Sequence, residues 1–275
     1  MAHISISTLT GRHEPKSVAK AMEPLWQAAG HHVDIGQNYA ADADVAFMHH
    51  DVSVIDQSAL PKAPADARVV NGRALDIRKR GYSQLKLSPH SDWDGPVLIK
   101  TDLNSFGGPE RVARQSRVAD IMEWPRDQLA RWNWKLARRL VPPTYPLLDH
   151  VRDVPDWVWH RPDLLVERFM PERDGPHYCL RGWMFLGTRG YSWRLISHDP
   201  MVKTGTMVGH EFFDDIPPEL ERARAACNID FGKIDYVVHD NLAIVLDINK
   251  TPFFHGDPNS PRLRDLAGGI EDFLK

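Results

Sequence analysis

Four polar residues near the C-terminus could together hold a metal ion and a phosphate group. Lys233 and Asp235 lie two residues apart, and so do Asp247 and Asn249. Residues two apart on a strand share a face, so each pair would point to one side of its strand. Carboxylate and amide oxygens without His or Cys suit magnesium or manganese, and such sites leave positions for substrate phosphates. The spacing therefore predicts a site for a hard divalent cation with one ammonium beside it.

These two polar faces meet only if the loop between the strands holds an odd number of residues. We expect the three-residue loop His239-Asp240-Asn241, whose asparagine tolerates a left-handed backbone. Lys233 then faces Asp247, and Asp235 lies diagonal to Asp247. The alternative is a surface ion pair between Lys233 and Asp247, which leaves Asn249 without a role.

Strands alternate with a helix over the first 75 residues, which favours a small parallel-sheet α/β domain. A largely helical middle region follows, and beyond it the pattern changes to successive strands. The expected strands are 3–9, 32–35, 44–49, 67–71, 96–100, 164–171, 177–187, 191–198, 234–238 and 242–248. The expected helices are 16–29, 75–86, 111–143, 217–226 and a last one after residue 261.

The helical middle region is rich in tryptophan and basic residues. Leu129, Trp132, Leu136 and Leu140 fall on one helical stripe, with arginines and lysines elsewhere around the helix. A membrane or nucleic-acid surface is one interpretation of this pattern. We expect the other, a core-packing helix with a solvated basic face, because tryptophan at helical spacing usually packs inside.

Composition places the chain among ordinary globular proteins. Apolar residues make up 42%, charged residues 26%, and the formal net charge is -3. No global polycation indicates a nucleic-acid partner, and no apolar run approaches the roughly 18 residues of a membrane helix. Two cysteines cannot build a disulfide framework, and the fourteen histidines show no metal-site spacing. We therefore expect a cytoplasmic protein without nucleic-acid or membrane partners, and a homodimer is compatible with this composition.

The string GKIDYVV…VLDINKTP resembles the C-terminal signature of the ATP-grasp superfamily, to which D-alanine:D-alanine ligases and glutathione synthetases belong. This resemblance implies that Asp235, Asp247 and Asn249 are magnesium ligands, with Asp247 bridging two ions. Lys233 stands where the family often has arginine and would stabilise the transferring phosphoryl group. Lysine keeps the charge at this position but loses the planar fork of a guanidinium.

The segment PVLIKTDLNSFGG resembles the family's strand lysine followed by a glycine-containing loop. The resemblance implies that Lys100 contacts the ATP phosphates or the adenine. The loop residues would close over the phosphates with their backbone N–H groups, although this loop holds less glycine than is usual for the family. These loop residues are Ser105, Phe106, Gly107 and Gly108.

The segment LLVERFMPERDG resembles the part of the family that contains the hinge between the two ATP-grasp lobes. By this resemblance the hinge begins at Glu167. Arg168 and Phe169 would offer backbone groups to the adenine edge, with Phe169 or the following methionine against its face. Asp174 has the best spacing for the acid that holds the ribose hydroxyls, and Glu172 is its rival.

Three further basic residues follow from the same resemblance. Lys203 matches a phosphate-contacting lysine, and Lys79 matches the lysine on the helix before the first ATP-binding strand, with Arg78 and Arg80 as competing matches. Arg181 either binds a substrate carboxylate or phosphate in the cleft or forms a structural ion pair.

The resemblance implies an ATP-grasp fold of two α+β lobes preceded by an α/β domain. The expected domains are residues 1–75, the lobe with the phosphate loop at 76–165, and the lobe with the hinge and metal site at 166–275. The implied function is an ATP-dependent ligase that forms C–N bonds from a small-molecule carboxylate and an amine, or less often another nucleophile. It would act through an acyl phosphate, with ATP and Mg²⁺, or Mn²⁺ in its place. The alternatives are an ATP-grasp phosphotransferase and a non-catalytic nucleotide-binding regulator.

Overall fold

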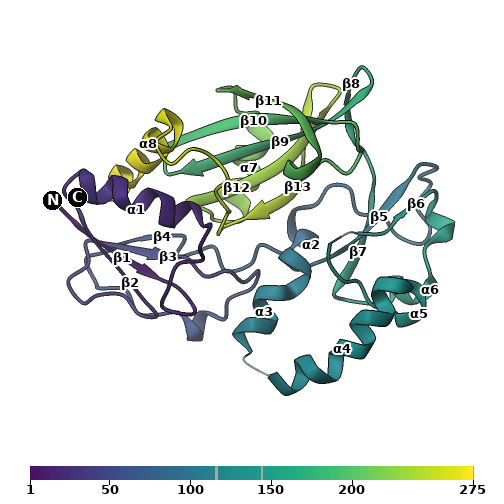
Figure 1. Ribbon diagram of the computed structural model, residues 1–275, viewed down its shortest axis with the longest axis horizontal. Helices are drawn as coiled ribbons and strands as arrows, with labels where there is room; N and C mark the ends of the chain where they lie inside the picture. Colours follow the sequence, from purple (N-terminus) through teal and green to yellow (C-terminus); the bar gives the residue numbers. More distant parts are fainter. Residues whose placement is uncertain (115–116, 144, 275) are drawn as a thin grey trace. The chain divides into compact units, whose positions relative to one another are not determined.

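The computed structural model describes residues 1–114, 117–143 and 145–274. The chain forms two compact units, each of which has its own core (Figure 1). Unit 1 combines Met1–Ile77 with Pro171–Lys275, and unit 2 is Arg78–Met170. The division into three domains at residues 75 and 165 stays a prediction.

The N-terminal part of unit 1 is a four-stranded parallel sheet in the order β2-β1-β3-β4, as the alternating pattern predicts. Ser17 caps its helix by accepting a hydrogen bond from the backbone N–H of Lys20. The elements are β1 (His3–Ser7), α1 (Val18–Ala28), β2 (His32–Gly36), β3 (Val45–Met48), η1 (Gln57–Ala59) and β4 (Arg68–Val70).

The C-terminal part of unit 1 is an antiparallel sheet in the order β11-β10-β9-β12-β13, with β8 paired to β9. Its strands are β8 (Glu172–Asp174), β9 (His177–Leu186), β10 (Arg189–Ser197), β11 (Met207–Phe213), β12 (Phe231–His239) and β13 (Leu242–Asn249). Its helices are η4 (Thr204–Thr206), α7 (Pro218–Ala226), α8 (Pro261–Gly268) and η5 (Gly269–Phe273).

One hydrophobic core joins the two sheets of unit 1. Phe47 of the parallel sheet and Phe231 of the antiparallel sheet pack edge to face with ring centroids 5.1 Å apart. Helices α1 and α8 lie side by side (Figure 1), and the Trp26 indole donates a hydrogen bond to the Ala267 carbonyl at 2.8 Å. The buried Asn71 amide bonds to the Phe231 backbone, so the hairpin base is fixed to the N-terminal part.

Unit 2 contains a three-stranded antiparallel sheet in the order β6-β5-β7, which packs against short helices. Its strands are β5 (Val97–Thr101), β6 (Leu147–Leu148) and β7 (Leu164–Arg168). Its helices are α2 (Lys79–Tyr82), η2 (Asn104–Gly107), α3 (Gly108–Ala113), α4 (Arg117–Trp132), α5 (Trp134–Ala137), η3 (Val151–Asp153) and α6 (Asp156–Trp159).

The prediction of a basic helix over 75–86 is wrong, because only the four residues of α2 are helical there. The backbone on either side pairs elsewhere in its own unit. Ile77 donates to the Ser53 carbonyl, and Leu87 donates to the Val166 carbonyl of β7. These extended pairings override the local helical pattern.

The prediction of a core-packing stripe is also wrong. Helix α4 ends at Trp132, and Asn133 adopts an extended backbone that caps the separate helix α5, which breaks the stripe. Leu129, Trp132 and Leu136 are exposed by 37%, 79% and 64%, whereas Leu140 is buried. Within the described residues, no helix has the length and apolar character needed to cross a membrane.

Candidate metal and nucleotide site

The hairpin of β12 and β13 closes with a two-residue turn. His239 pairs with Leu242, and Asp240 and Asn241 between them have φ values of 50° and 63°. Two consecutive left-handed residues match the twist of the flanking strands, and Asp and Asn tolerate this conformation. The predicted three-residue loop is therefore wrong, because Asp240 and Asn241 alone make the turn.

The two-residue turn alone would leave Asp235 and Asp247 on opposite faces of the hairpin. A β-bulge on β13 brings them to the same face. Tyr236 pairs with Val245, but Asp235 pairs with Asp247, so Leu246 is one extra residue on β13. Beyond the extra residue, the side chains of β13 alternate in the opposite sense, so Asp247 lies on the same face as Asp235. The predicted register is corrected as well: Asp247 faces Asp235, and Lys233 faces Asn249.

This face of the hairpin carries a net negative charge, because it has two carboxylates and one ammonium. Two carboxylates stand directly opposite each other, an arrangement that is destabilising across a sheet. Lys233 Nζ lies 2.8 Å from Asp235 Oδ2 and compensates part of the negative charge. Burial alone would lower the pKa of Lys233, but Asp235 and Asp247 outweigh burial and raise it. The lysine therefore remains an ammonium.

Asn249 is held in place by the residues that follow it. Its Oδ1 accepts hydrogen bonds from the Thr251 backbone N–H at 2.8 Å and the Thr251 hydroxyl at 3.3 Å. The same hydroxyl lies 2.6 Å from Asp51 Oδ1. Asp51 was missed at the sequence level, because it lies 200 residues from Thr251 and carries no motif.

The donor set fits a hard divalent cation. Asp235 and Asp247 offer carboxylate oxygens from neighbouring strands, and Asn249 would offer its amide oxygen in place of the longer, 3.3 Å hydrogen bond from the Thr251 hydroxyl. Across the described ranges, no group of three or more His, Cys, Asp and Glu side chains could hold a metal ion. A metal at this hairpin would therefore need a ligand besides the two aspartates, and Asn249 is the predicted one.

Arg181 and Glu172, both predicted to contact ligands, bind each other. Three N–O contacts of 2.8–2.9 Å join them, and Glu172 Oε2 also accepts the Val238 N–H at 2.8 Å. Burial would lower the pKa of Arg181, but its pairing with Glu172 raises it overall. This geometry matches the structural ion pair and leaves Asp174 as the better ribose candidate. The exposed Asp174 pairs with Arg194 at 3.1 Å.

Lys203 lies apart from the hairpin in the sequence, on the exposed segment before η4. Its backbone N–H donates to the Thr206 hydroxyl at 3.2 Å, and its carbonyl accepts the Thr206 N–H. The backbone of this turn is therefore fixed, while the lysine side chain extends from an exposed position.

In unit 2, the strand lysine forms a buried ion pair. Lys100 Nζ lies 2.6 Å from Glu167 Oε2, and both side chains are less than one-tenth exposed. The next two residues use their N–H groups within the unit: Arg168 donates to the Leu85 carbonyl and Phe169 to the Pro96 carbonyl. While these two bonds are in place, the N–H groups of Arg168 and Phe169 cannot donate to an adenine edge.

Lys79 anchors the segment predicted to cover phosphates. Its Nζ donates to Asn104 Oδ1 at 2.7 Å and to the Leu103 carbonyl at 3.3 Å. Three successive residues of this loop have positive φ, and the first two of them carry side chains, a conformation that costs free energy. They are Ser105 (47°), Phe106 (58°) and Gly107 (68°).

One further contact and the start of α3 define the end of this loop. The Phe106 ring stacks on Tyr145 with centroids 4.2 Å apart. Gly108 then begins α3 with an ordinary helical backbone. The segment predicted to close over the phosphates is thus a short turn with a left-handed backbone, held by contacts with Lys79 and Tyr145.

Solved structures similar to this chain are ATP-grasp proteins. The RimK domain ATP-grasp protein of Sphaerobacter thermophilus DSM 20745 is 14% identical with a TM-score of 0.50, covering 99% of each chain. The RiPP-associated ATP-grasp ligase of Chryseobacterium gregarium, in complex with ADP and a leader and core peptide, is 10% identical with a TM-score of 0.52, covering 100% of this chain and 98% of that one. The macrocyclase MdnC of Microcystis aeruginosa MRC, bound with precursor peptide MdnA, is 9% identical with a TM-score of 0.53, covering 99% of this chain and 100% of that one.

No protein-family model matches the sequence, and the search of curated proteins finds no match either. At identities this low, structural similarity establishes the fold. The chain has the ATP-grasp fold, with mixed helices and strands in the parallel and antiparallel sheets described above.

Proposed function

We propose that the chain is an ATP-dependent ligase that activates a carboxylate as an acyl phosphate and joins it to an amine. The main support is the register of the hairpin, in which Asp235 lies directly opposite Asp247 with Lys233 2.8 Å from Asp235. Two opposed carboxylates and one ammonium suit a cation that carries a polyphosphate. The ATP-grasp fold adds a nucleotide context to this chemistry.

Six of the predicted residues have a task in this proposal. Asp235, Asp247 and Asn249 would hold Mg²⁺ or Mn²⁺, which when bound neutralises charge on the phosphates. Lys233, kept protonated by the aspartates, would stabilise the phosphoryl group in transfer. Lys100 would stabilise the negative charge of the ATP phosphates, and the loop anchored by Lys79 would exclude water from the acyl phosphate.

The proposed reaction has two balanced steps. A substrate carboxylate oxygen bonds to the γ-phosphorus while the bond from that phosphorus to the bridging oxygen breaks, and ADP leaves. An uncharged amine nitrogen then attacks the acyl carbon, the phosphate leaves, and the nitrogen loses a proton. One of the similar structures is a complex with a leader and core peptide and another is bound with a precursor peptide, so candidate substrates include peptide carboxylates beside small molecules.

The test measures ADP and phosphate release across panels of carboxylates and amines, small and peptidic, with mass detection of the joined product. Asp247→Asn keeps the shape of the side chain and should lower Mg²⁺-dependent turnover by at least about a hundredfold. Asp240→Asn, on the turn of the same hairpin, is the matched control and should retain activity. Turnover that is unchanged in Asp247→Asn would contradict the metal assignment.

The two alternatives give different products. A phosphotransferase would yield a stable phosphorylated product and ADP without free phosphate. A nucleotide-binding regulator would bind ATP and Mg²⁺ and release no ADP with any member of the panels. The combined presence of Asp235, Asp247 and Asn249 argues against the regulator, because a protein that does not turn over ATP need not keep all three.

A further inference from the structure

Helix α4 directs two carboxylates toward Arg139 and leaves several large apolar side chains exposed. Arg139, which follows α5, forms ion pairs with Glu123 at 2.6 Å and Asp127 at 2.5 Å, and both acids lie on α4. Arg126 of α4 donates to the Ala137 carbonyl of α5 at 3.4 Å. The inner contact between the helices is therefore polar, and it uses both acidic side chains.

Four large apolar side chains of α4 and α5 are exposed, and we call them the Trp-Leu surface. Its members are Trp124 (63% exposed), Leu129 (37%), Trp132 (79%) and Leu136 (64%). Amphipathic helices normally bury such residues, and contiguous exposed apolar patches mark interaction sites. This arrangement is unfavourable in water unless another surface covers it.

The charges around the Trp-Leu surface are positive. Arg131 of α4, Lys135 of α5 and Arg138, which directly follows α5, are exposed. The nearby carboxylates of Glu123 and Asp127 are already paired with Arg139. The chain as a whole has a net charge of -3, so this positive region is local. A complementary partner would carry negative charge beside apolar groups.

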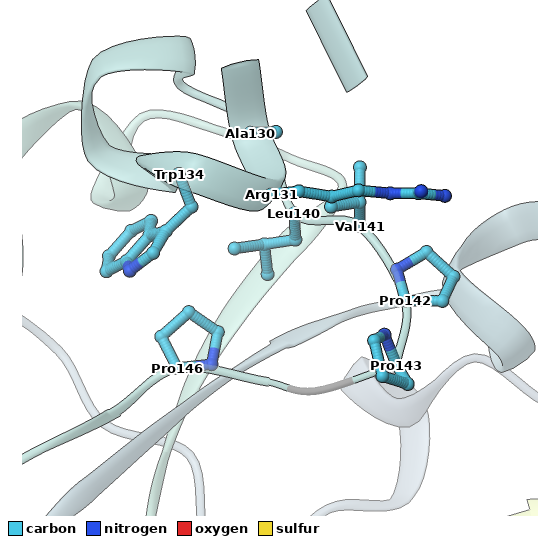
Figure 2. Close-up of a pocket in the computed structure, with 8 residues that line it drawn as sticks. All are labelled: Ala130, Arg131, Trp134, Leu140, Val141, Pro142, Pro143 and Pro146. Atoms are coloured by element: carbon cyan, nitrogen blue, oxygen red, sulfur yellow. The ribbon is translucent and has the colours of Figure 1, made fainter. Parts of the chain in front are cut away.

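A pocket of about 700 Å³ opens beside this surface. Figure 2 shows Trp134, Leu140 and Pro146 on one side of the pocket, and Arg131 with two further prolines on the other. A volume of this size accepts a bulky side chain or a small molecule. Aromatic and aliphatic walls with one arginine suit an apolar anchor that has an acidic neighbour.

We propose that the Trp-Leu surface and its pocket are a docking site for an acidic polypeptide segment with a bulky apolar anchor side chain. A lipid surface is flat and would leave the concave pocket unfilled. A second copy of the chain would set the exposed cations of one α4–α5 pair against the same cations of the other. A peptide fits all three features, because its acids meet the cations, its anchor fills the pocket, and its backbone covers the tryptophans.

The test uses the full chain without ATP, so it does not depend on the proposed catalytic function. The probe is a fluorescein-labelled synthetic peptide of Glu and Asp residues around a central Trp-Leu pair, followed by fluorescence anisotropy. One control peptide replaces the Trp-Leu pair with two serines, and another replaces every acid with lysine. We expect the first probe to bind at least about tenfold more tightly than either control, and more weakly in high salt.

Variants locate the site. Trp132→Ser and the double variant Arg131→Glu with Lys135→Glu should each weaken binding by about tenfold or more. Leu242→Ser is the matched control, because Leu242 is 58% exposed but lies in unit 1. The affinity of this variant for the acidic probe peptide should stay within about twofold of that of the unchanged chain. Thermal unfolding confirms that the variants fold, as expected for side chains this exposed.

Three results would overturn the proposal. In the first, the acidic probe binds no better than the control peptides, or equally well to Trp132→Ser. In the second, anionic phospholipid vesicles bind the chain through Trp132 while the peptides do not, which would make this a membrane surface. In the third, the chain forms a dimer in solution that Trp132→Ser dissociates, which would identify a second copy as the partner.

Discussion

Replacing Glu172 with glutamine should destabilise the chain and leave nucleotide binding largely intact. Glu172 lies on β8, and both of its carboxylate oxygens accept hydrogen bonds from Arg181 of β9. Its Oε2 also accepts the backbone N–H of Val238 on β12. One nearly buried carboxylate therefore connects three strands, which is a structural task.

The magnitude follows from these contacts. Removing one partner of a buried ion pair costs about 3–5 kcal/mol, because the other charge stays buried. Two features reduce this cost in Glu172→Gln. Arg181 is 24% exposed, so water screens part of its charge, and the glutamine oxygen can still accept the Val238 N–H. We expect a loss of about 2–3 kcal/mol in the free energy of unfolding, or roughly 5–10 °C in Tm.

The assay is a double-mutant cycle of Glu172→Gln, Arg181→Met and the double variant, measured by urea and thermal unfolding. The double variant should be destabilised by about 1–2 kcal/mol less than the sum of the two single variants, because it leaves no unpaired charge. The Kd for ATP should change by less than about threefold. A destabilisation below about 0.5 kcal/mol together with a tenfold weaker ATP affinity would refute the argument and place Glu172 on the nucleotide.

Three further predictions concern other parts of the chain. Without metal, and in a Lys233→Met background that removes the attraction between Lys233 and Asp247, Asp247→Asn should raise the free energy of unfolding by about 0.2–1 kcal/mol by relieving the opposed aspartates, which thermal unfolding in EDTA can measure; a loss of stability there would contradict the opposed charges. Burial, reinforced by two neighbouring histidines, lowers the pKa of His49 to about 3 from 6.5. The unfolded chain therefore binds this proton first, and stability present above pH 6.5 falls toward pH 3 by up to about 1.4 kcal/mol per pH unit. His49→Phe should remove the contribution of this one proton to the change of stability with pH, which urea titrations at several pH values measure. An unchanged slope would contradict the lowered pKa of His49. Gly107→Ala should cost about 1 kcal/mol because its φ is 68°, whereas Gly108→Ala, with φ of −57° and open space at the Cβ position, should be nearly neutral; equal effects in urea titrations would count against the left-handed backbone.

The elements that the sequence predicts correctly are those whose pattern and packing agree. The helix expected at 16–29 is found as α1, with Ser17 as its cap and an apolar face that enters the core of unit 1. The parallel strands of the N-terminal sheet and the hairpin strands are also found where the pattern places them. In each case a local signal and a buried face act together, so tertiary contacts reinforce the local preference.

The failures have two physical causes. The segment 75–86 has a helical pattern, but the backbone at its start pairs with residues 53–55 and the backbone at its end pairs with β7. Helix α4 has a stripe that would suit a core, but its polar side is already satisfied by Arg139, so the stripe faces outward. Neither outcome is visible in a local window, because each depends on partners elsewhere in the unit.

The candidate metal site shows a third kind of limit. Asp235 and Asp247 lie on one face whenever the number of turn residues plus the number of bulge residues is odd. An odd turn satisfies it, and so does a two-residue turn with one bulge, and the chain uses the second solution through Leu246. Asp240 and Asn241 are both suited to a left-handed backbone, which stabilises the shorter turn and transfers the extra residue to the strand. Parity therefore predicts which side chains meet, whereas the competition between turn and bulge decides which residues face each other across the strands.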